Sequence, residues 1–292
     1  IDQLVIKNAQ LNADKILIKK ATATNFSSTM SLSEDNVAKI NDYHFNIANG
    51  EVNGKINYDL KTFSGNAEMT IKNADAQIIG ENFFDLPGQM YGHVTGDMHL
   101  SCNGLSSVEC VNTLSGGGSF EVRDGRMPKL GSLEYLLKAG NLITGGITGL
   151  SINGIIDLIT PLKTGNFDKI SGEVKVENGI ASDINVYSSG KDLNMYMTGN
   201  YNLSTFVADM EVYGSLSKNF STLLGKIGNS SLNRLFNTIP GININDINPS
   251  STSKINKIPN FEKANVLRVF KAEIFGDING SNYVKSFRWI KN

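Results

Sequence analysis

Residues 51–60 read EVNGKINYDL, and this stretch decides the predicted fold. Its apolar residues Val52, Ile56, Tyr58 and Leu60 alternate with polar ones. Successive side chains of a β-strand point to opposite faces, so the stretch predicts a strand with one buried and one solvated face. Such strands are typical of antiparallel sheets, because the strands of parallel sheets are buried on both faces.

The same alternation recurs along most of the chain. Its apolar positions are Ala67, Met69 and Ile71; Val94, Met98 and Leu100; Phe120 and Val122; Val174 and Val176; Ile184 and Val186; Leu193, Met195 and Met197; Phe206, Ala208, Met210 and Val212; and Phe270, Ala272 and Ile274. We therefore predict a mainly β fold built from one large antiparallel sheet.

A degenerate repeat indicates how the strands are joined. Residues 63–73, 114–125 and 170–179 each begin with an apolar residue, Ser and Gly, continue as a short alternating strand and reach Asn or Asp, usually followed by Gly. This order indicates a bend, a half-buried strand and a tight turn. The copies are too irregularly spaced for a solenoid, so we expect hairpins laid side by side along a growing sheet.

Composition restricts the classes of function. The 292 residues carry 27 Lys and Arg against 28 Asp and Glu, a formal net charge of −1. This balance gives no electrostatic reason to expect nucleic acid or an anionic bilayer surface as a partner. Only 3 His and 2 Cys are present. We therefore expect no enzyme activity and no cofactor.

Two stretches have helical rather than strand periodicity. Leucines at helical spacing after Pro128 predict a helical insertion, and a second amphipathic helix is expected over 217–240 before Pro240 and Gly241. The second helix is a candidate lid or cap through Phe220, Leu223, Leu224, Ile227, Leu235 and Phe236. Taken as one elongated domain over 1–292, the predicted order is leading strands 1–50, strands 51–127, helical insertion 128–161, strands 166–214, amphipathic helix 217–240, loop 241–262 and final strands 263–292.

The two cysteines, Cys102 and Cys110, flank a turn-rich stretch. They lack the four-ligand pattern of a structural zinc site. A disulfide that closes a hairpin in an oxidising compartment and two separate buried thiols both remain open.

Residues 92–100, GHVTGDMHL, contain the best candidate for metal chemistry. On a strand, His93, Thr95, Asp97 and His99 share one face. Polar residues on the solvated face of a strand are expected in any case, so we assign no metal site here. The glycines at 116–118 precede a strand and not a helix, which argues against a phosphate-binding loop.

The order of these segments resembles the C-terminal region of the AsmA-like proteins, bacterial envelope proteins related to TamB and YhdP. The match runs from about Val52 to Ile290 and rests on residues 114–126, the leucine helix behind them, residues 170–180, the strands 193–199 and 208–214, and the helix 220–239. The resemblance implies a long, curled sheet whose concave apolar groove carries lipid across the periplasm, with short amphipathic helices as caps or lid. It also implies an inner-membrane anchor upstream of Ile1.

An apolar sheet face must be covered by helices, by a second sheet or by a ligand, because exposed apolar surface costs roughly 25 cal/mol per Å². The burial argument leaves these three covers open, and the resemblance implies a phospholipid or another acyl lipid as the ligand, with inner- or outer-membrane proteins as further partners. The groove candidates are Val52, Ile56, Leu60, Met69, Ile71, Val94, Met98, Leu100, Phe120, Val122, Val174, Val176, Met195, Met197, Met210 and Val212.

Two rival hypotheses belong to other classes. In the first, the sheet closes on itself as a sandwich or barrel, and the chain is a structural or adhesive module that binds protein partners through its strand edges. In the second, the chain is an enzyme that uses His93 or His99.

Overall fold

The computed structural model describes residues 4–83, 87–88, 90–126, 166–191, 193–217, 241–243, 249–261, 266–277 and 284–291. The strands are β1 (Ile6–Ile18), β2 (Ala21–Leu32), β3 (Val37–Ile47), β4 (Gly50–Asp59), β5 (Ser64–Asp75), β6 (Tyr91–Asn103), β7 (Ser115–Arg126), β8 (Asn166–Glu177), β9 (Ile180–Ser189), β10 (Leu193–Asn202), β11 (Val207–Ser217), β12 (Gly241–Asn243), β13 (Val266–Asp277) and β14 (Val284–Lys291). The described helices are α1 (Ala76–Phe83), α2 (Ser107–Thr113) and α7 (Pro249–Ile255).

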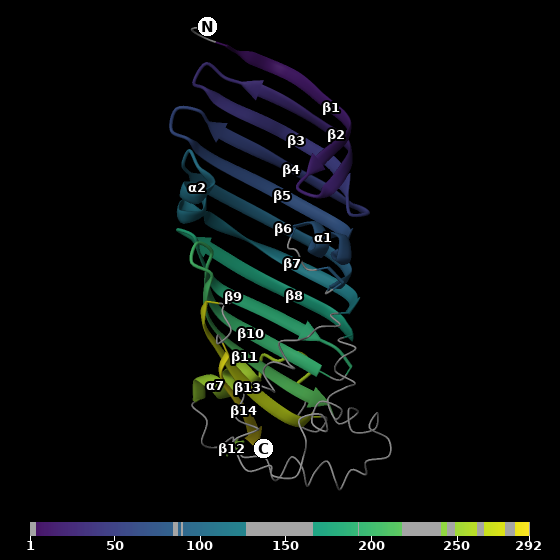
Figure 1. Ribbon diagram of the computed structural model, residues 1–292, viewed down its shortest axis with the longest axis vertical. Coiled ribbons are helices and arrows are strands. Elements are labelled where there is room, and N and C mark those ends of the chain that lie inside the picture. Colours follow the sequence, from purple (N-terminus) through teal and green to yellow (C-terminus); the bar gives the residue numbers. More distant parts are fainter. Residues whose placement is uncertain are drawn as a thin grey trace. The chain divides into compact units, whose positions relative to one another are not determined.

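The strands pair almost entirely in chain order, from β1 to β11 and then β13, β14 and β12 (Figure 1). The pairing is antiparallel except that β12 runs parallel to β14, and the sheet is not closed. The mainly β, antiparallel fold predicted from the alternation is thereby confirmed. Within the described ranges, no helix is both long and apolar enough to cross a membrane.

The chain divides into two compact units. Unit 1 comprises residues 1–123, 171–184 and 202–205, and unit 2 comprises 124–170, 185–201 and 206–292. The predicted helical insertion at 128–161 lies outside the described residues. The predicted helix at 217–240 does so from residue 218 onward, and with it all six lid candidates.

Unit 1 contains bulges that interrupt the strand alternation. The pairing register shifts at Asn25 in β2, Asp42 in β3 and Asn73 in β5, and each of these residues has a positive φ between 48° and 56°. A bulge residue in the left-handed region favours Gly, Asn or Asp. Further Asn residues with positive φ, such as Asn36 and Asn178, lie at turns. These positions account for some of the 35 asparagines in the sequence.

Each unit has its own core cluster. In unit 1, Ala21, Ala23, Tyr43, Ile47 and Val52 are buried together, with Phe83 of α1 packed against them. In unit 2 the buried cluster consists of Tyr196, Tyr213, Ile255, Ile258, Val266, Val269 and Ile290.

The range 241–262, predicted as a loop, contains β12 and α7. Ile255 at the end of α7 and Ile258 just after it are almost completely buried in the core of unit 2, and Phe261 packs against this core. The helix α7 was not predicted because residues 250–253 are Ser and Thr, which have low helix propensity.

Candidate functional site: the apolar sheet face of unit 1

The strand register of unit 1 places apolar side chains in rows on one face. One row joins Ile40, Ile56, Ala67 and Leu100 across β3, β4, β5 and β6. A second row joins Tyr43, Gly54, Met69 and Met98, and a third joins Phe45, Val52, Ile71 and Gly96. Six of the predicted lipid-contact residues therefore share one face of three neighbouring strands: Val52, Ile56, Met69, Ile71, Met98 and Leu100.

The opposite face of the same strands carries polar and charged side chains. Lys55 pairs with Glu68 at 3.0 Å, and Asn57 donates to Asn66 at 3.0 Å. The Ser119 hydroxyl donates to Asp97 at 2.5 Å. These neighbours satisfy one another on the solvated side of the sheet, as strand alternation predicts.

Glycines on the apolar face lie opposite aromatic rings. A Cβ built on Gly54 would approach the Tyr43 hydroxyl oxygen to 2.4 Å, and one built on Gly65 would approach the Tyr58 ring to 2.8 Å. The Tyr43 ring therefore lies directly over the Gly54 backbone, and its hydroxyl donates to the Glu68 carbonyl at 3.2 Å. Burial raises the pKa of the Tyr43 phenol above its ordinary value.

Burial on the apolar face falls along β4. Val52 is 2 % exposed, Ile56 is half-buried and Leu60, just after the strand, is 44 % exposed. The buried end is the one covered by α1, whose Phe83 packs against the core while its carbonyl accepts a hydrogen bond from Lys19. On the neighbouring strands β6 and β7, Met98 and Phe120 of the same face are exposed by more than a third.

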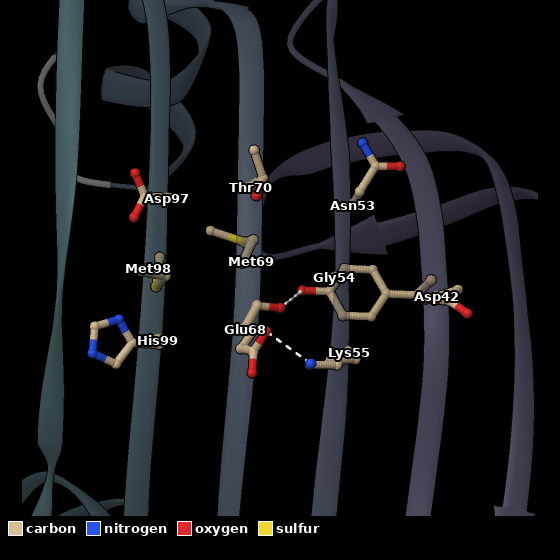
Figure 2. Close-up of a pocket in the computed structure, with 11 residues that line it drawn as sticks. Asp42, Asn53, Gly54, Lys55, Glu68, Met69, Thr70, Asp97, Met98 and His99 are labelled. Atoms are coloured by element: carbon tan, nitrogen blue, oxygen red, sulfur yellow. Dashed lines mark hydrogen bonds and ion pairs between the residues drawn. The ribbon is translucent and has the colours of Figure 1, made fainter.

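An open depression of about 690 Å³ crosses β3 to β6 (Figure 2). Figure 2 shows the Met69 side chain extending from β5 toward β6, where Met98 lies. The rest of the lining is polar and includes Asp42, Lys55 and Asp97. Because Lys55, Glu68, Asp97 and His99 belong to the solvated face, this depression does not extend the apolar face.

The remaining predicted lipid-contact residues fall in several places. In unit 1, Val122 and Val176 are buried while Val94 and Val174 are half-buried. Met195, Met197, Met210 and Val212 belong to unit 2, where Met197 pairs with Val212 and Met210 pairs with Gly199. The candidates thus form two sets, one in each unit.

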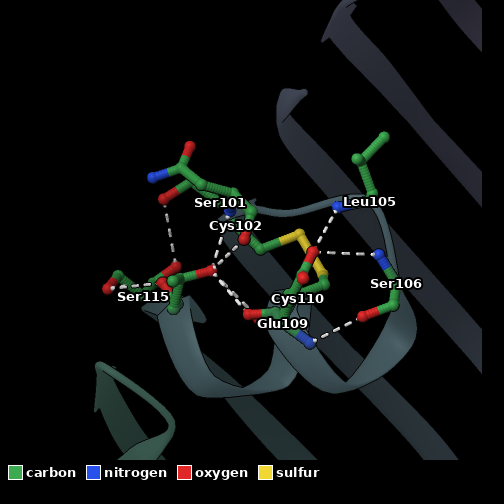
Figure 3. Close-up of a disulfide and its surroundings, with 9 residues drawn as sticks. Ser101, Cys102, Leu105, Ser106, Glu109, Cys110 and Ser115 are labelled. Carbon is green, nitrogen blue, oxygen red and sulfur yellow. Dashed lines mark hydrogen bonds between the residues drawn. A yellow bond between two sulfur atoms is a disulfide. The ribbon is translucent and has the colours of Figure 1, made fainter. Parts of the chain in front are cut away.

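Cys102 of β6 and Cys110 of α2 form a disulfide (Figure 3). Of the two possibilities that the sequence leaves open, the structure contains the disulfide and not two buried thiols. The bond ties a short helix to the end of the strand that carries Met98 and Leu100.

Among the described residues, no group of three His, Cys, Asp or Glu side chains is arranged to hold a metal ion. In the strand register, His99 lies opposite Glu68 and His93 lies opposite Asp75. Asp59 ends β4, and hydrogen bonds from the backbone N–H groups of Thr62 and Lys61 in the following turn hold its pKa below the ordinary value.

Unit 2 contains a charge cluster under α7. Glu211 accepts from Lys254 of α7 and from Lys271 of β13, and Lys271 also pairs with Glu273 at 2.9 Å. Burial would raise the pKa of Glu211, but the hydrogen bonds from Lys254 and Lys271 outweigh it and lower that pKa. The cluster fastens α7 to the sheet.

Sequence reasoning missed α1 and α2, although both have start signals. Asp75 accepts hydrogen bonds from the backbone N–H groups of Gln77 and Ile78 at the start of α1. Ser106 and Glu109 form a complete capping box at the start of α2. The pattern S-x-x-E at 106–109 was the available signal.

Comparison with protein families, with curated proteins and with solved structures gives no match for this chain.

Proposed function

We propose that this chain is a non-enzymatic lipid-binding and lipid-transfer module of the bacterial cell envelope that contributes to phospholipid transport and outer-membrane assembly. One observation carries the proposal: an apolar row continues from the buried core of unit 1 onto an uncovered part of the same sheet face. Met98 and Phe120 lie on that part. Apolar surface of this kind costs roughly 25 cal/mol per Å² when water covers it, so a ligand is favoured there.

The proposed mechanism is passive. The face works as an apolar groove in which acyl chains lie along residues such as Met98, Leu100 and Phe120, while head groups stay in water at its mouth. Methionine suits a variable ligand because its unbranched side chain adapts to irregular shapes. No nucleic acid, metal or cofactor takes part.

The proposed location is the periplasm, with an inner-membrane tether upstream of this segment. The Cys102–Cys110 disulfide supports an oxidising compartment, since such bonds are rare in the reducing cytosol. Inner- and outer-membrane proteins would then be the natural partners for delivery and release.

Native mass spectrometry of the purified chain tests the proposal, with extraction and identification of any bound lipid. We expect co-purified phospholipid in the wild type and a clear loss of it in Met98→Asn. His99→Asn is the matched control, because His99 is the next residue on the same strand, is exposed and points to the opposite face. A chain that contains no lipid and takes up none when lipid is added would refute the proposal.

A second function, a structural or adhesive module that binds protein through strand edges, is favoured by β1. This 13-residue strand ends the sheet order and pairs only with β2 among the described strands. Its polar groups along the other edge are available for strand addition. Cross-linking to a protein partner at β1 in a lipid-free preparation would favour this function over lipid transfer.

A further inference from the structure

The helix α2 is held in place without contributing to the core. It has seven residues, and none of them is buried. Leu105 and Val108, at its start, are 72 % and 66 % exposed. A helix this short is unstable without packing, so other interactions must hold it in place.

Three sets of bonds fix α2. The disulfide joins it to β6, and the capping box joins Ser106 and Glu109. The Glu109 carboxylate also accepts from the Leu105 N–H at 2.7 Å. The Thr113 hydroxyl accepts from the Asn103 N–H at 2.8 Å and donates to the Asn103 carbonyl at 2.6 Å. Figure 3 shows the Leu105 side chain extending away from the disulfide.

Neighbouring turns continue this surface along the strand ends of unit 1. The Gly104 N–H donates to the Phe63 carbonyl at 2.9 Å, and the Gly179 N–H donates to the Leu114 carbonyl at 2.9 Å. Residues 60–63, 104–114 and 178–180 thus lie side by side, and we call them the α2 rim. Its exposed apolar residues are Leu60, Phe63, Leu105, Val108 and Ile180.

We infer that the α2 rim docks on the surface of an uncharged phospholipid bilayer, an inference that rests on the proposed lipid-binding function. The bonds around α2 hold two apolar side chains outward in water, which is useful only if a partner buries them. The rim contains a single Lys, Lys61, and a single Glu, Glu109, so it has no excess of charge that selects an anionic or a cationic partner.

The shape of the α2 rim favours a bilayer over a protein. Its apolar side chains come from separate turns, and neither the depression across β3 to β6 nor the one beside α1 is lined by any residue of the rim. A stable protein interface needs a contiguous patch of about 800 Å² on each side. A bilayer accepts separate apolar tips, because each one enters the interfacial region independently.

Co-sedimentation of the intact, disulfide-bonded chain with phosphatidylcholine vesicles tests the inference. We expect Leu105→Ser with Val108→Ser to weaken vesicle binding at least tenfold, because the variant has lost the two apolar side chains that would be buried in the bilayer. Leu17→Ser is the matched control: Leu17 is also 72 % exposed, but it lies beside the β1–β2 turn, at the opposite end of β2 from the α2 rim. We expect it to change binding less than about twofold.

Reduction of the disulfide provides a second measurement, since it removes no apolar side chain from the rim. We expect the reduced chain to bind vesicles several-fold more weakly, because Leu105 and Val108 are then no longer held outward. Equal binding by the wild type and the Leu105/Val108 variant would overturn the inference, as would equal losses in that variant and in Leu17→Ser. Cross-linking of the α2 rim to a protein, without vesicle binding, would overturn it in favour of a protein partner.

The outcomes separate this inference from the proposed function. If the chain co-purifies with lipid but does not bind vesicles, the lipid-binding face is supported and bilayer docking by the α2 rim is refuted. If the chain binds vesicles through Leu105 and Val108 but no lipid can be extracted from it, the docking surface is supported and the lipid-binding face is refuted.

Discussion

The two units use the same strand alternation and leave different surfaces exposed. In unit 2 side chains on both faces of the sheet are buried: Tyr213 on one face and its neighbour Val212 on the other are each less than a tenth exposed. Ile255 and Ile258, in and just after α7, pack on the tyrosine face. In unit 1 the apolar face is covered near Val52, while Met98 and Phe120 retain more than a third of their exposure.

This contrast shows that an alternating strand predicts two faces but not what covers them. The face of unit 2 that carries Tyr196, Glu211 and Tyr213 has mixed polarity, yet a segment from elsewhere in the chain buries much of it. The purely apolar face of unit 1 is the one left partly open. A ligand site is therefore better placed in unit 1 than in unit 2.

The largest expected effect tests the buried side of this contrast. Phe270 is 1 % exposed, and its ring lies over Gly214 on the paired strand. Phe270→Ala should cost about 3–5 kcal/mol of unfolding free energy, as removal of a buried aromatic side chain does. Met98→Ala, in unit 1, should cost less than about 1 kcal/mol because Met98 is already partly exposed. Urea denaturation followed by circular dichroism measures both, and equal losses would remove the contrast.

The disulfide gives the next largest effect, and it is confined to unit 1. Cys102→Ser with Cys110→Ser should cost about 2–3 kcal/mol, because a short closed loop is released. Hydrogen exchange should show α2 and the start of β7 losing protection while β13 keeps it. Loss of protection in β13 as well would mean that the two units do not respond independently.

A smaller effect tests the packing of tyrosine over glycine. A Cβ on Gly54 would lie 2.1 Å from the Glu68 carbonyl oxygen, a backbone atom with little freedom to move. Gly54→Ala should therefore cost about 1–3 kcal/mol. Gly65→Ala is the control, since its closest contact at 2.8 Å is the movable Tyr58 ring, and it should lower the thermal midpoint less. The reverse order would argue against this explanation.

The smallest effect concerns pH and unit 2. The folded pKa of Glu211 lies below its ordinary value, so the carboxylate stabilises unit 2 above the ordinary glutamate pKa of about 4.3. This stabilisation is lost as pH falls through the lower folded pKa, which leaves Lys254 and Lys271 without their shared anion. The loss should be about 1 kcal/mol or less because water still reaches the carboxylate.

Near-ultraviolet circular dichroism of the buried tyrosines measures this loss between about pH 6 and pH 3. Glu211→Gln should show a flatter profile than the wild type, since it has no carboxylate to protonate at this position. Identical profiles would mean that Glu211 does not fasten α7.

The sequence predicted strands well wherever the alternation is unbroken. Residues 51–60 form β4 almost to the residue, and Met69 and Met98 lie side by side as their shared periodicity suggests. It failed across bulges: Ala23 and Phe26 lie three positions apart yet join one core, because Asn25 takes a positive φ between them. Only the folded register reveals such a shift.

The sequence predicted which apolar residues lie on the strands of the candidate site, but not which of them are exposed. All sixteen lipid-contact candidates lie in or directly beside strands, yet Val52 is buried and Leu60 is exposed although both belong to the same pattern. The difference arises from α1, which covers one end of the face, and its contacts with β2 join residues far apart in the sequence. Long-range contacts of this kind leave no periodic signal in one sequence.

Whether a protein sample contains the Cys102–Cys110 bond depends on the compartment in which the chain was produced. Chains produced in a reducing cytosol would carry two thiols, whereas chains exported before oxidation would carry the cross-link. Both populations share the same strands, so their far-ultraviolet spectra would hardly differ, while intact mass would separate them by two hydrogens. A mixed batch would average a fastened and a loose α2 in every assay.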